Sequence, residues 1–266
     1  MRSKADLQAA IRQHRRAVLV VNTRSRRGAR MYRDAGRRLE AAGFGLLGSF
    51  AASRPGQLET SLAAALDLAP DLLIAGGGDG TVSLAARHLA HRDIALGIVP
   101  SGTTNNFART LGLPLTVAGA VGVLTGGKVA DVDLGHVNGT YFANLVSVGL
   151  SGHVAATVRP DLKRLLGRPA YPLTALARLP RHRPFQAAVT AGGQTRTFTT
   201  HQLNVANGSF HAGRPITGDA SADDRLHTDP PLPLDIDGEI SGQTPARITL
   251  APNALRVMTG PGFPDT

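Results

Sequence analysis

A glycine-rich turn between an apolar strand and a helix is the sequence feature that most constrains the fold of this chain. Residues 71–75 are mostly apolar and run directly into Gly76-Gly77-Gly78-Asp79-Gly80-Thr81, and a helix is expected over residues 82–91. Glycine has no Cβ and tolerates unusual φ and ψ angles, so the backbone N–H groups of such a turn can approach a phosphate closely. The turn predicts a nucleotide site at the end of a buried strand.

Asp79 lies inside this turn and needs a separate explanation. A carboxylate repels phosphate unless a cation, a hydroxyl or a sugar lies between them. Asp79 is therefore predicted to serve Mg²⁺ or the substrate. The alternative is that it only caps the helix that follows.

Strands and helices alternate strictly through the first half of the chain. The expected strands cover residues 17–21, 44–50, 72–75 and 94–99, and the expected helices cover residues 4–16, 29–42, 57–68 and 82–91. Such alternation predicts a parallel sheet with helices on its faces. Ligands bind outside the carboxyl ends of such strands, so the polar loops after Val21, Ala75 and Val99 should converge on one crevice.

The pattern changes near residue 129. Residues 132–137 and 141–150 predict a β-hairpin around Asn138-Gly139, a dipeptide that supplies the positive φ angles of a type I′ turn. More strand-like runs cover residues 186–191, 195–204 and 246–250. The predicted fold class is α/β: an N-terminal three-layer parallel-sheet domain in residues 1–130 carries the nucleotide loop, and an antiparallel β-sandwich domain follows in residues 131–266.

Composition narrows the range of partners. The net charge of +10 favours an anionic partner, but 4% aromatic residues and no tryptophan leave few stacking platforms, so nucleic acid is an unlikely one. Cysteine is absent, which excludes disulfides, thiolate metal sites and cysteine nucleophiles. No apolar run is long enough for a signal peptide or a membrane span, so a cytoplasmic protein is expected.

Together, the motifs resemble those of the diacylglycerol kinase catalytic-domain family, soluble lipid kinases that include bacterial lipid kinases and sphingosine kinases. They occur in family order across residues 17–259. The residues that carry the resemblance are Asn22-Thr23-Arg24-Ser25, Gly77-Gly78-Asp79-Gly80-Thr81, Gly102-Thr103-Thr104-Asn105-Asn106-Phe107-Ala108-Arg109, Asp133-Leu134-Gly135, Asn138-Gly139, Tyr141-Phe142, Asn144 and Asp235-Ile236-Asp237-Gly238-Glu239.

The resemblance implies Mg²⁺-dependent transfer of the γ-phosphate of ATP to the hydroxyl of a lipid such as diacylglycerol, with the nucleotide between the two domains. Asp79 would serve Mg²⁺ or position the acceptor, and Glu239 or Asp237 would accept the hydroxyl proton, with Glu239 preferred. The ATP contacts implied by position are Asn22, Thr23, Arg24, Ser25, Arg26, Ser53, Gly77, Gly78, Asp79, Gly80, Thr81, Val82, Ser83 and Thr103.

A second, structural Mg²⁺ is also implied by family position. It would use Asp224 together with the backbone carbonyls of Ser221 and Leu226. Residues 217–239 hold seven acidic residues and one basic residue, an acidic segment in a basic chain, and oxygen ligands suit this hard cation. The alternative is that Asp223-Asp224 is a solvated turn.

Several positions depart from the family pattern. Leu84 and Asn106 each replace a common carboxylate, and Arg225 replaces a common glycine. Only four residues separate Leu226 from the strand expected at residues 231–234, where relatives have more strands, so the β-sandwich domain is expected to be shortened. An NAD kinase-like enzyme and a catalytically degenerate nucleotide-binding relative therefore stay open as alternatives.

Two basic segments suggest where the protein meets lipid. Residues 1–30 hold nine Lys and Arg residues, and residues 159–183 hold seven, interleaved with leucines. This mixture favours peripheral association with an anionic membrane surface, where a lipid substrate would lie. The alternative is a solvated helix packed by its leucine face, and the sequence also leaves a homodimer open.

Overall fold

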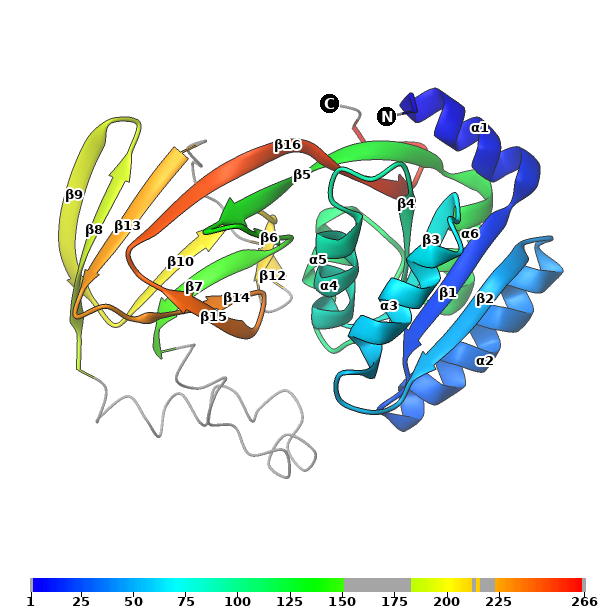
Figure 1. Cartoon of the computed structure of the whole chain (residues 1–266), viewed down its shortest axis with the longest axis horizontal. Coiled ribbons are helices and arrows are strands. Elements are labelled where there is room, and N and C mark those ends of the chain that lie inside the picture. The colour runs from blue at the N-terminus through cyan, green and yellow to red at the C-terminus, as the bar shows by residue number, and fades with distance from the viewer. Residues whose placement is uncertain (1, 151–182, 212–213, 216–222, 265–266) are drawn as a thin grey trace. The chain divides into compact units, whose positions relative to one another are not determined.

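The computed structural model describes residues 2–150, 183–211, 214–215 and 223–264 of the chain. The chain divides into two compact units (Figure 1). The first unit comprises Met1–Leu134, Gly208–Ile216 and Pro252–Thr266, and the second comprises Gly135–Asn207 and Thr217–Ala251. The sequence predicts a single boundary at residue 130 with all later residues in the β domain, whereas the chain returns to the first unit at Gly208 and again at Pro252.

The first unit contains the alternating elements that the sequence predicts. Its four leading strands are parallel, in the order β2-β1-β3-β4. The elements in chain order are α1 (Lys4–His14), β1 (Arg16–Asn22), α2 (Arg26–Ala41), β2 (Gly45–Ala52), α3 (Gln57–Asp67), β3 (Leu72–Gly77), α4 (Asp79–Leu89), β4 (Ala95–Pro100), α5 (Asn106–Thr110) and α6 (Val117–Gly126).

Helices cover both faces of this sheet. Successive strand residues face opposite sides, and Leu19 of β1 and Ile74 of β3 share a buried core with Leu7 of α1, Met31 of α2 and Leu124 of α6. Helices α3 and α4 pack against β1, β3 and β4 on the other side (Figure 1). The three-layer α/β prediction is confirmed.

Two long strands, β5 (Lys128–Val137) and β16 (Ala246–Thr259), contribute residues to both units. In β16, Val257 pairs in parallel with Leu96 of β4 and is fully buried, so the end of the chain adds a strand to the first unit. The strand expected from the sequence covers only residues 246–250, whereas β16 continues to Thr259. Asn253 lies within β16 and has a φ of 52°.

The second unit is built from antiparallel strands. One sheet has the order β10-β7-β14-β15, and on the other side β16, β13, β8 and β9 pair in sequence. Buried side chains from both sheets, including Val148, Leu226 and Leu234, form one core between them, as in a β-sandwich. The remaining strands are β6 (Thr140–Phe142), β7 (Leu145–Gly149), β8 (Phe185–Ala191), β9 (Gln194–Thr200), β10 (Gln202–Ala206), β13 (Asp223–Asp229), β14 (Pro233–Ile236) and β15 (Glu239–Gln243), and β11 (Phe210–His211) with β12 (Arg214–Pro215) lies in the first unit.

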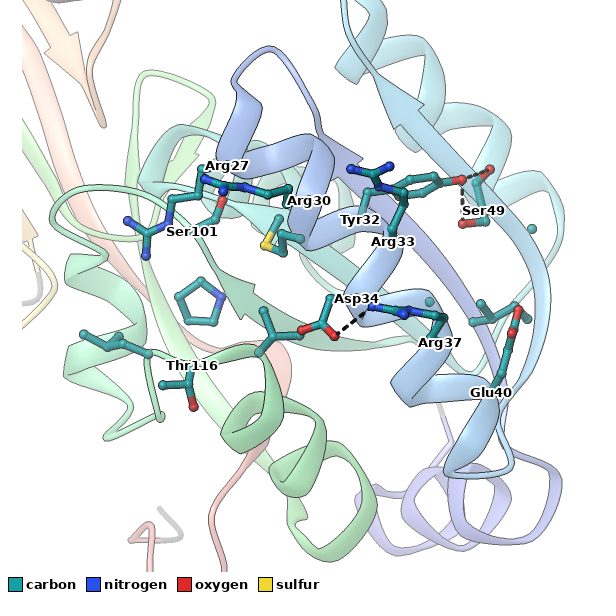
Figure 2. A pocket seen from close by; sticks show the side chains of 17 residues that line it. Arg27, Arg30, Tyr32, Arg33, Asp34, Arg37, Glu40, Ser49, Ser101 and Thr116 are labelled. Carbon is teal, nitrogen blue, oxygen red and sulfur yellow. Dashed lines mark hydrogen bonds and ion pairs between the residues drawn. The ribbon is translucent and has the colours of Figure 1, made fainter.

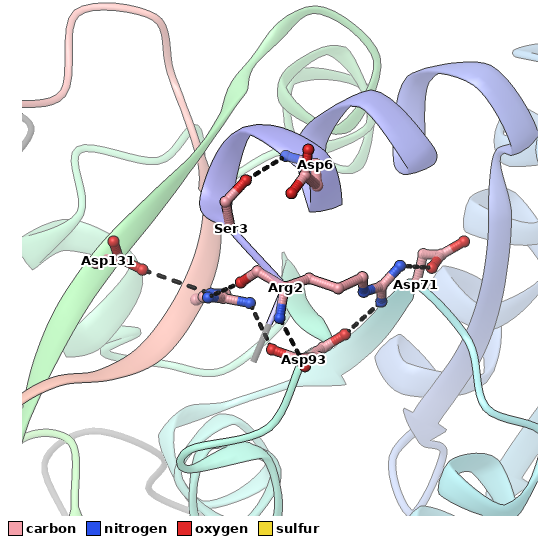
Figure 3. A network of polar contacts seen from close by, with 7 residues as sticks. Arg2, Ser3, Asp6, Asp71, Asp93 and Asp131 are labelled. Carbon is pink, nitrogen blue, oxygen red and sulfur yellow. Dashed lines mark hydrogen bonds and ion pairs between the residues drawn. The ribbon is translucent and has the colours of Figure 1, made fainter.

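An ion-pair network ties Arg2 to the start of the sheet strands (Figure 3). The Arg2 guanidinium lies 2.7 Å from Asp71 Oδ1, and its backbone N–H donates a 2.9 Å hydrogen bond to Asp93 Oδ2. Arg256 of β16 donates to Asp93 Oδ1 at 2.8 Å and to the Arg2 carbonyl at 2.6 Å. The backbone hydrogen bond from Arg2 and the nearby Arg256 hold the pKa of Asp93 below its ordinary value, against the opposing effect of burial.

Within the described part of the chain, no helix has both the length and the apolar character needed to cross a bilayer. The basic and leucine-rich segment that the sequence analysis singled out lies, apart from Arg183, outside the described residues.

Candidate active site

Three polar loops follow the carboxyl ends of β1, β3 and β4 at one edge of the parallel sheet, as the sequence predicts. The side-chain amide of Asn22 donates a 3.3 Å hydrogen bond to Thr81 Oγ1, which joins the first loop to the second. The backbone N–H of Ser101 donates to the carbonyl of Gly77 at 2.8 Å, which joins the second loop to the third. The loops therefore form one continuous polar edge.

The first loop leads directly into α2. The backbone N–H of Arg24 donates to Asn22 Oδ1 at 3.2 Å, and Ser25 Oγ caps the helix by accepting the N–H of Gly28 at 3.0 Å. A Cβ on Gly28 would lie 2.3 Å from the Asn22 carbonyl oxygen, so only glycine allows this approach. The helix begins at Arg26 rather than at residue 29 as expected, which places Arg24, Ser25 and Arg26, all exposed, at its N-terminus.

Ser53 lies beside this loop, at the end of β2. The backbone N–H of Thr23 donates to the carbonyl of Ala52 at 2.9 Å, so the ends of β1 and β2 are neighbours. The backbone N–H of Ser53 donates to Gln57 Oε1 at 2.9 Å, and the side chain of Ser53 is exposed. The structure brings Ser53 to the same edge as the other predicted ATP contacts.

The glycine-rich turn is tighter than the sequence suggests. Helix α4 begins at Asp79, three residues before the expected start, with Gly78 as a cap residue that makes no side-chain cap bond. A Cβ on Gly77 would lie 2.3 Å from Thr81 Oγ1, so a larger residue cannot fit there. Thr81, Val82 and Ser83 are buried in the first turns of α4. The groups that the turn can offer to a ligand are therefore mainly its backbone N–H groups.

Asp79 connects this turn to the third loop. Its Oδ2 accepts a 2.7 Å hydrogen bond from the hydroxyl of Thr104, and its Oδ1 accepts a 3.3 Å bond from the backbone N–H of Phe107 in the first turn of α5. No side chain of α5 itself caps that helix, so Asp79 supplies the cap from a distant part of the sequence. Because Asp79 contacts Thr104 and Phe107, it does more than cap its own helix.

The third loop is held in shape by its own asparagine. Asn105 Oδ1 accepts the N–H of Gly102 at 2.8 Å, and Asn105 Nδ2 donates to the carbonyl of Gly102 at 3.0 Å. A Cβ on Gly102 would lie 2.5 Å from the Cα of Gly78, so the two loops touch through their backbones. Thr103 is exposed at this position. The sequence analysis missed Thr104 and Asn105 as site residues, although both stand inside the motif that it quoted.

In the second unit, Asp237 and Glu239 have different surroundings. Both carboxylate oxygens of Asp237 are engaged: Oδ2 accepts the N–H of Ala143 at 2.7 Å, and Oδ1 accepts those of Asn144 and Leu145 at 2.9 Å each. Asp237 and Gly238 form the turn between β14 and β15 with positive φ angles, and Glu239 is the exposed first residue of β15. Asp237 thus fixes the start of β7, while Glu239 is an exposed residue.

The residues named for the structural metal are only partly described. Ser221 lies outside the described residues, and Asp224 and Leu226 lie on β13, which pairs with β8 on one edge and β16 on the other. The Leu226 side chain is buried in the sandwich core. Among the described residues, no three His, Asp or Glu side chains gather closely enough to hold a metal ion. A Mg²⁺ that arrives with a nucleotide needs only one or two carboxylates, which Asp79 fits.

Comparison with known proteins agrees with this geometry. Residues 16–137 match the family model described as the diacylglycerol kinase catalytic domain. This region is similar to the diacylglycerol kinase catalytic domain. The matched residues include the Asn22 loop, the glycine turn and the Asp79–Thr104 contact, so the family resemblance of these motifs is confirmed.

Curated relatives are similar to part of this chain. The diacylglycerol kinase of Bacillus subtilis strain 168 is 39% identical over 127 residues, which are 47% of this chain and 42% of that protein. A YegS-like lipid kinase of Pseudomonas aeruginosa, named as probable, is 44% identical over 108 residues, or 40% of this chain and 35% of that protein. These matches span less than half the length of either relative.

Solved structures show the same fold over nearly the whole chain. A crystal structure of a diacylglycerol kinase from Bacillus anthracis strain Sterne superposes with a TM-score of 0.74 at 23% identity, covering 93% of this chain and 97% of the other. The two-unit α/β and β-sandwich architecture is therefore shared, although the identity is too low to transfer a substrate.

Proposed function

We propose that this protein is an ATP-dependent lipid kinase that transfers the γ-phosphate to a lipid hydroxyl, with diacylglycerol or a related lipid as acceptor. The observation that carries the proposal is the contact of Asp79 with Thr104 and Phe107, which joins the glycine turn to the loop after β4, inside a region that matches the diacylglycerol kinase catalytic domain. Phosphoryl transfer depends mainly on positioning and charge neutralisation, which such an edge supplies.

The nucleotide would be bound largely by backbone. The glycine turn and the N-termini of α2 and α4 offer N–H donors and positive helix ends to phosphate oxygens. Arg24 and Arg26 are exposed beside them and add charge-assisted contacts. The ATP contacts expected from the sequence, including Thr103 and Ser53 at the margins, fit a nucleotide that lies along this edge.

Asp79 is the residue proposed to hold Mg²⁺ on the nucleotide. A bound Mg²⁺ would supply neutralising charge to the phosphate oxygens. Thr104 and the N–H of Phe107 fix the orientation of the carboxylate, and each carboxylate oxygen keeps lone pairs beyond these bonds. For the second Mg²⁺, we propose Asp224 with the carbonyls of Ser221 and Leu226.

Glu239 is proposed as the group that accepts the proton of the acceptor hydroxyl. In the reaction, the hydroxyl oxygen forms a bond to the γ-phosphorus, the bond from that phosphorus to the leaving oxygen of ADP breaks, and the proton passes to the carboxylate. Asp237 is less suited to this role because three backbone N–H groups already occupy its oxygens. Its contacts support a positioning role for the turn that carries Glu239.

The acceptor lies in a membrane, so we propose that the protein works in the cytoplasm in peripheral contact with an anionic bilayer. The net charge of +10 supports this contact. Leu84 follows the glycine turn in the sequence, and Asn106 directly precedes Phe107, whose N–H donates to Asp79; both are neutral where a carboxylate is common in the family. These two substitutions are the observation that favours the second candidate, a relative that binds nucleotide without turnover.

The experiment that tests the proposal incubates purified protein with γ-labelled ATP and Mg²⁺ in separate reactions with diacylglycerol, a sphingoid base, phosphatidylglycerol and NAD. We expect label in one of the lipids and none after Asp79→Asn. Label in NADP instead would support an NAD kinase. Binding of ATP without any labelled product would support the degenerate relative and contradict the kinase.

A further inference from the structure

The outer face of α2 carries a row of arginines. Arg26, Arg30, Arg33 and Arg37 recur at intervals of four, three and four residues, a spacing that places them on one side of a helix. The buried residues of α2, Met31, Ala35 and Leu39 among them, lie on the opposite side. We call these four arginines the α2 stripe, and from Arg26 to Arg37 it extends about 16 Å.

The stripe is largely uncompensated by acidic side chains. Arg26, Arg30 and Arg33 are exposed and make no ion pair within the residues that the structure describes. Arg37 lies 3.7 Å from Asp34 but keeps 78% of its side chain exposed, and the shorter 3.0 Å contact of Asp34 is with Arg38. The charge of the stripe therefore faces solvent.

A hollow runs beside the stripe and reaches the loop edge (Figure 2). Its volume is about 1190 Å³, and its lining includes Arg30, Arg33 and Arg37 from α2 together with Ser101 and Thr116. Ser101 is the residue whose N–H bonds the carbonyl of Gly77, so the hollow joins the arginines to the end of β3. Asp34 and Glu40 also line the hollow, but the arginines outnumber them, so the hollow suits anionic groups that arrive from solvent.

The chemistry of the stripe selects headgroups rather than acyl chains. The large aliphatic side chains of α2, Met31 and Leu39, are buried beneath the helix, so its outer face offers nothing that would insert into hydrocarbon. Arginine forks bind phosphate oxygens in pairs, and each cation near an anionic surface contributes about 1 kcal/mol. The four arginines of the α2 stripe are therefore complementary in charge to a plane of phosphodiester headgroups.

We propose that the α2 stripe is the surface by which the protein docks on an anionic bilayer. The choice of a bilayer over other polyanions rests on the proposed function, since a lipid acceptor must be reached at a membrane. Docking along α2 holds the loop edge within one helix length of the headgroups. No acyl chain needs to leave the bilayer for the stripe to bind.

The test compares two triple variants of the full chain by sedimentation with vesicles. The vesicles are phosphatidylcholine with about 30 to 50% phosphatidylglycerol, and binding is measured at about 0.1 M salt. The stripe variant carries Arg30→Gln, Arg33→Gln and Arg37→Gln. The matched control carries Arg16→Gln, Arg92→Gln and Arg196→Gln, three exposed arginines elsewhere that remove the same charge. At about 1 kcal/mol per cation, the stripe variant should bind roughly 100-fold more weakly, and the control should stay within a few-fold of the unaltered protein.

Equal loss in both variants, or no loss in the stripe variant, would overturn the proposal, as would vesicle binding that ignores phosphatidylglycerol content. A stripe-dependent preference for a short DNA duplex over the vesicles would also overturn it, in favour of nucleic acid. A second assay, phosphorylation of a short-chain acceptor in detergent micelles, distinguishes failure of the docking proposal from failure of the proposed kinase function. The stripe variant should keep its activity in micelles. If the unaltered protein binds vesicles through the stripe but phosphorylates no acceptor, the docking surface stands and the proposed kinase function fails.

Discussion

The hydroxyl of Thr104 donates a 2.7 Å hydrogen bond to Oδ2 of Asp79, across 25 residues of sequence. This bond and the one from the N–H of Phe107 fix the only carboxylate of the glycine turn. A charge placed next to a phosphate site is useful only if its direction is fixed, because the metal or the acceptor must meet it in one geometry. The Thr104–Asp79 bond joins the glycine turn to the loop after β4, which are two separate motifs in the sequence.

Thr104→Val should weaken nucleotide binding in the presence of Mg²⁺ by about tenfold, because the methyl group that replaces the hydroxyl leaves Asp79 Oδ2 without its donor. The stability loss should be about 1 kcal/mol. Thr104→Ser keeps the hydroxyl and serves as the control. Equilibrium titration with ATP and Mg²⁺ measures the effect, and equal affinities for the valine and serine variants would show that the bond does not orient Asp79.

Asp237→Asn should lower the free energy of unfolding by about 2 kcal/mol, because an amide NH₂ would face backbone N–H groups that now donate to a carboxylate. Glu239→Gln changes an exposed residue and should alter stability by no more than about 0.5 kcal/mol. Urea unfolding of the two variants side by side measures the difference. A stability loss that is the same for both would remove the positioning role of Asp237.

Gly77→Ala should cost about 1 to 3 kcal/mol of stability, because the added Cβ would lie 2.3 Å from Thr81 Oγ1 and 2.4 Å from Thr81 Cβ. Gly80→Ala is the matched control: its Cβ would meet nothing within 4 Å, and alanine in a helix gains up to about 1 kcal/mol over glycine. Thermal unfolding followed by circular dichroism compares them. A Gly77→Ala protein as stable as Gly80→Ala would mean that the turn is looser than described.

The Arg2–Asp93–Arg256 network predicts a dependence of stability on pH. The pKa of Asp93 is lowered in the folded protein by the backbone N–H of Arg2 and by Arg256, so its contribution is present above the ordinary pKa of aspartate and is lost as the pH falls through the folded pKa. The charged groups that face it are Arg2 and Arg256, while Asp71 and Asp131 pair with the same two arginines.

Asp93→Asn should therefore be less stable than the unaltered protein at pH 7, and the gap should shrink on acidification from about pH 4 downward. Urea unfolding of both proteins at several pH values measures it, with the other carboxylates common to the pair. A gap that stays constant to pH 2 would contradict the lowered pKa.

The sequence predicts the alternating half of the fold well because each element there is defined by local signals. Apolar runs such as 72–75 and helix signals such as Gly43 after α2 identify elements without knowledge of distant contacts. Helix α4 begins three residues earlier than predicted because the carbonyl of Gly78 accepts the N–H groups of Thr81 and Val82, which an apolar pattern starting at Val82 does not reveal. Helix α5 was missed since its cap, Asp79, comes from another loop.

The second half of the molecule shows the limit of local reasoning. The end of β16 returns to the first unit because Val257 pairs with Leu96, a contact across 161 residues that no neighbouring sequence encodes. The separate roles of Asp237 and Glu239 depend on pairing with residues 143–145, also far away in the chain. The motif identifies both acids, and only the fold distinguishes the one that holds the backbone from the one that is exposed.

The measurement that tests the central claim most directly is a single-turnover assay with γ-labelled ATP, Mg²⁺ and a total lipid extract, comparing the unaltered protein with Glu239→Gln. We predict a labelled lipid from the unaltered protein and a loss of at least 100-fold in its rate of formation with Glu239→Gln, while both proteins bind ATP equally. Equal rates would contradict the assignment of Glu239, and the absence of any labelled lipid despite ATP binding would contradict the lipid kinase.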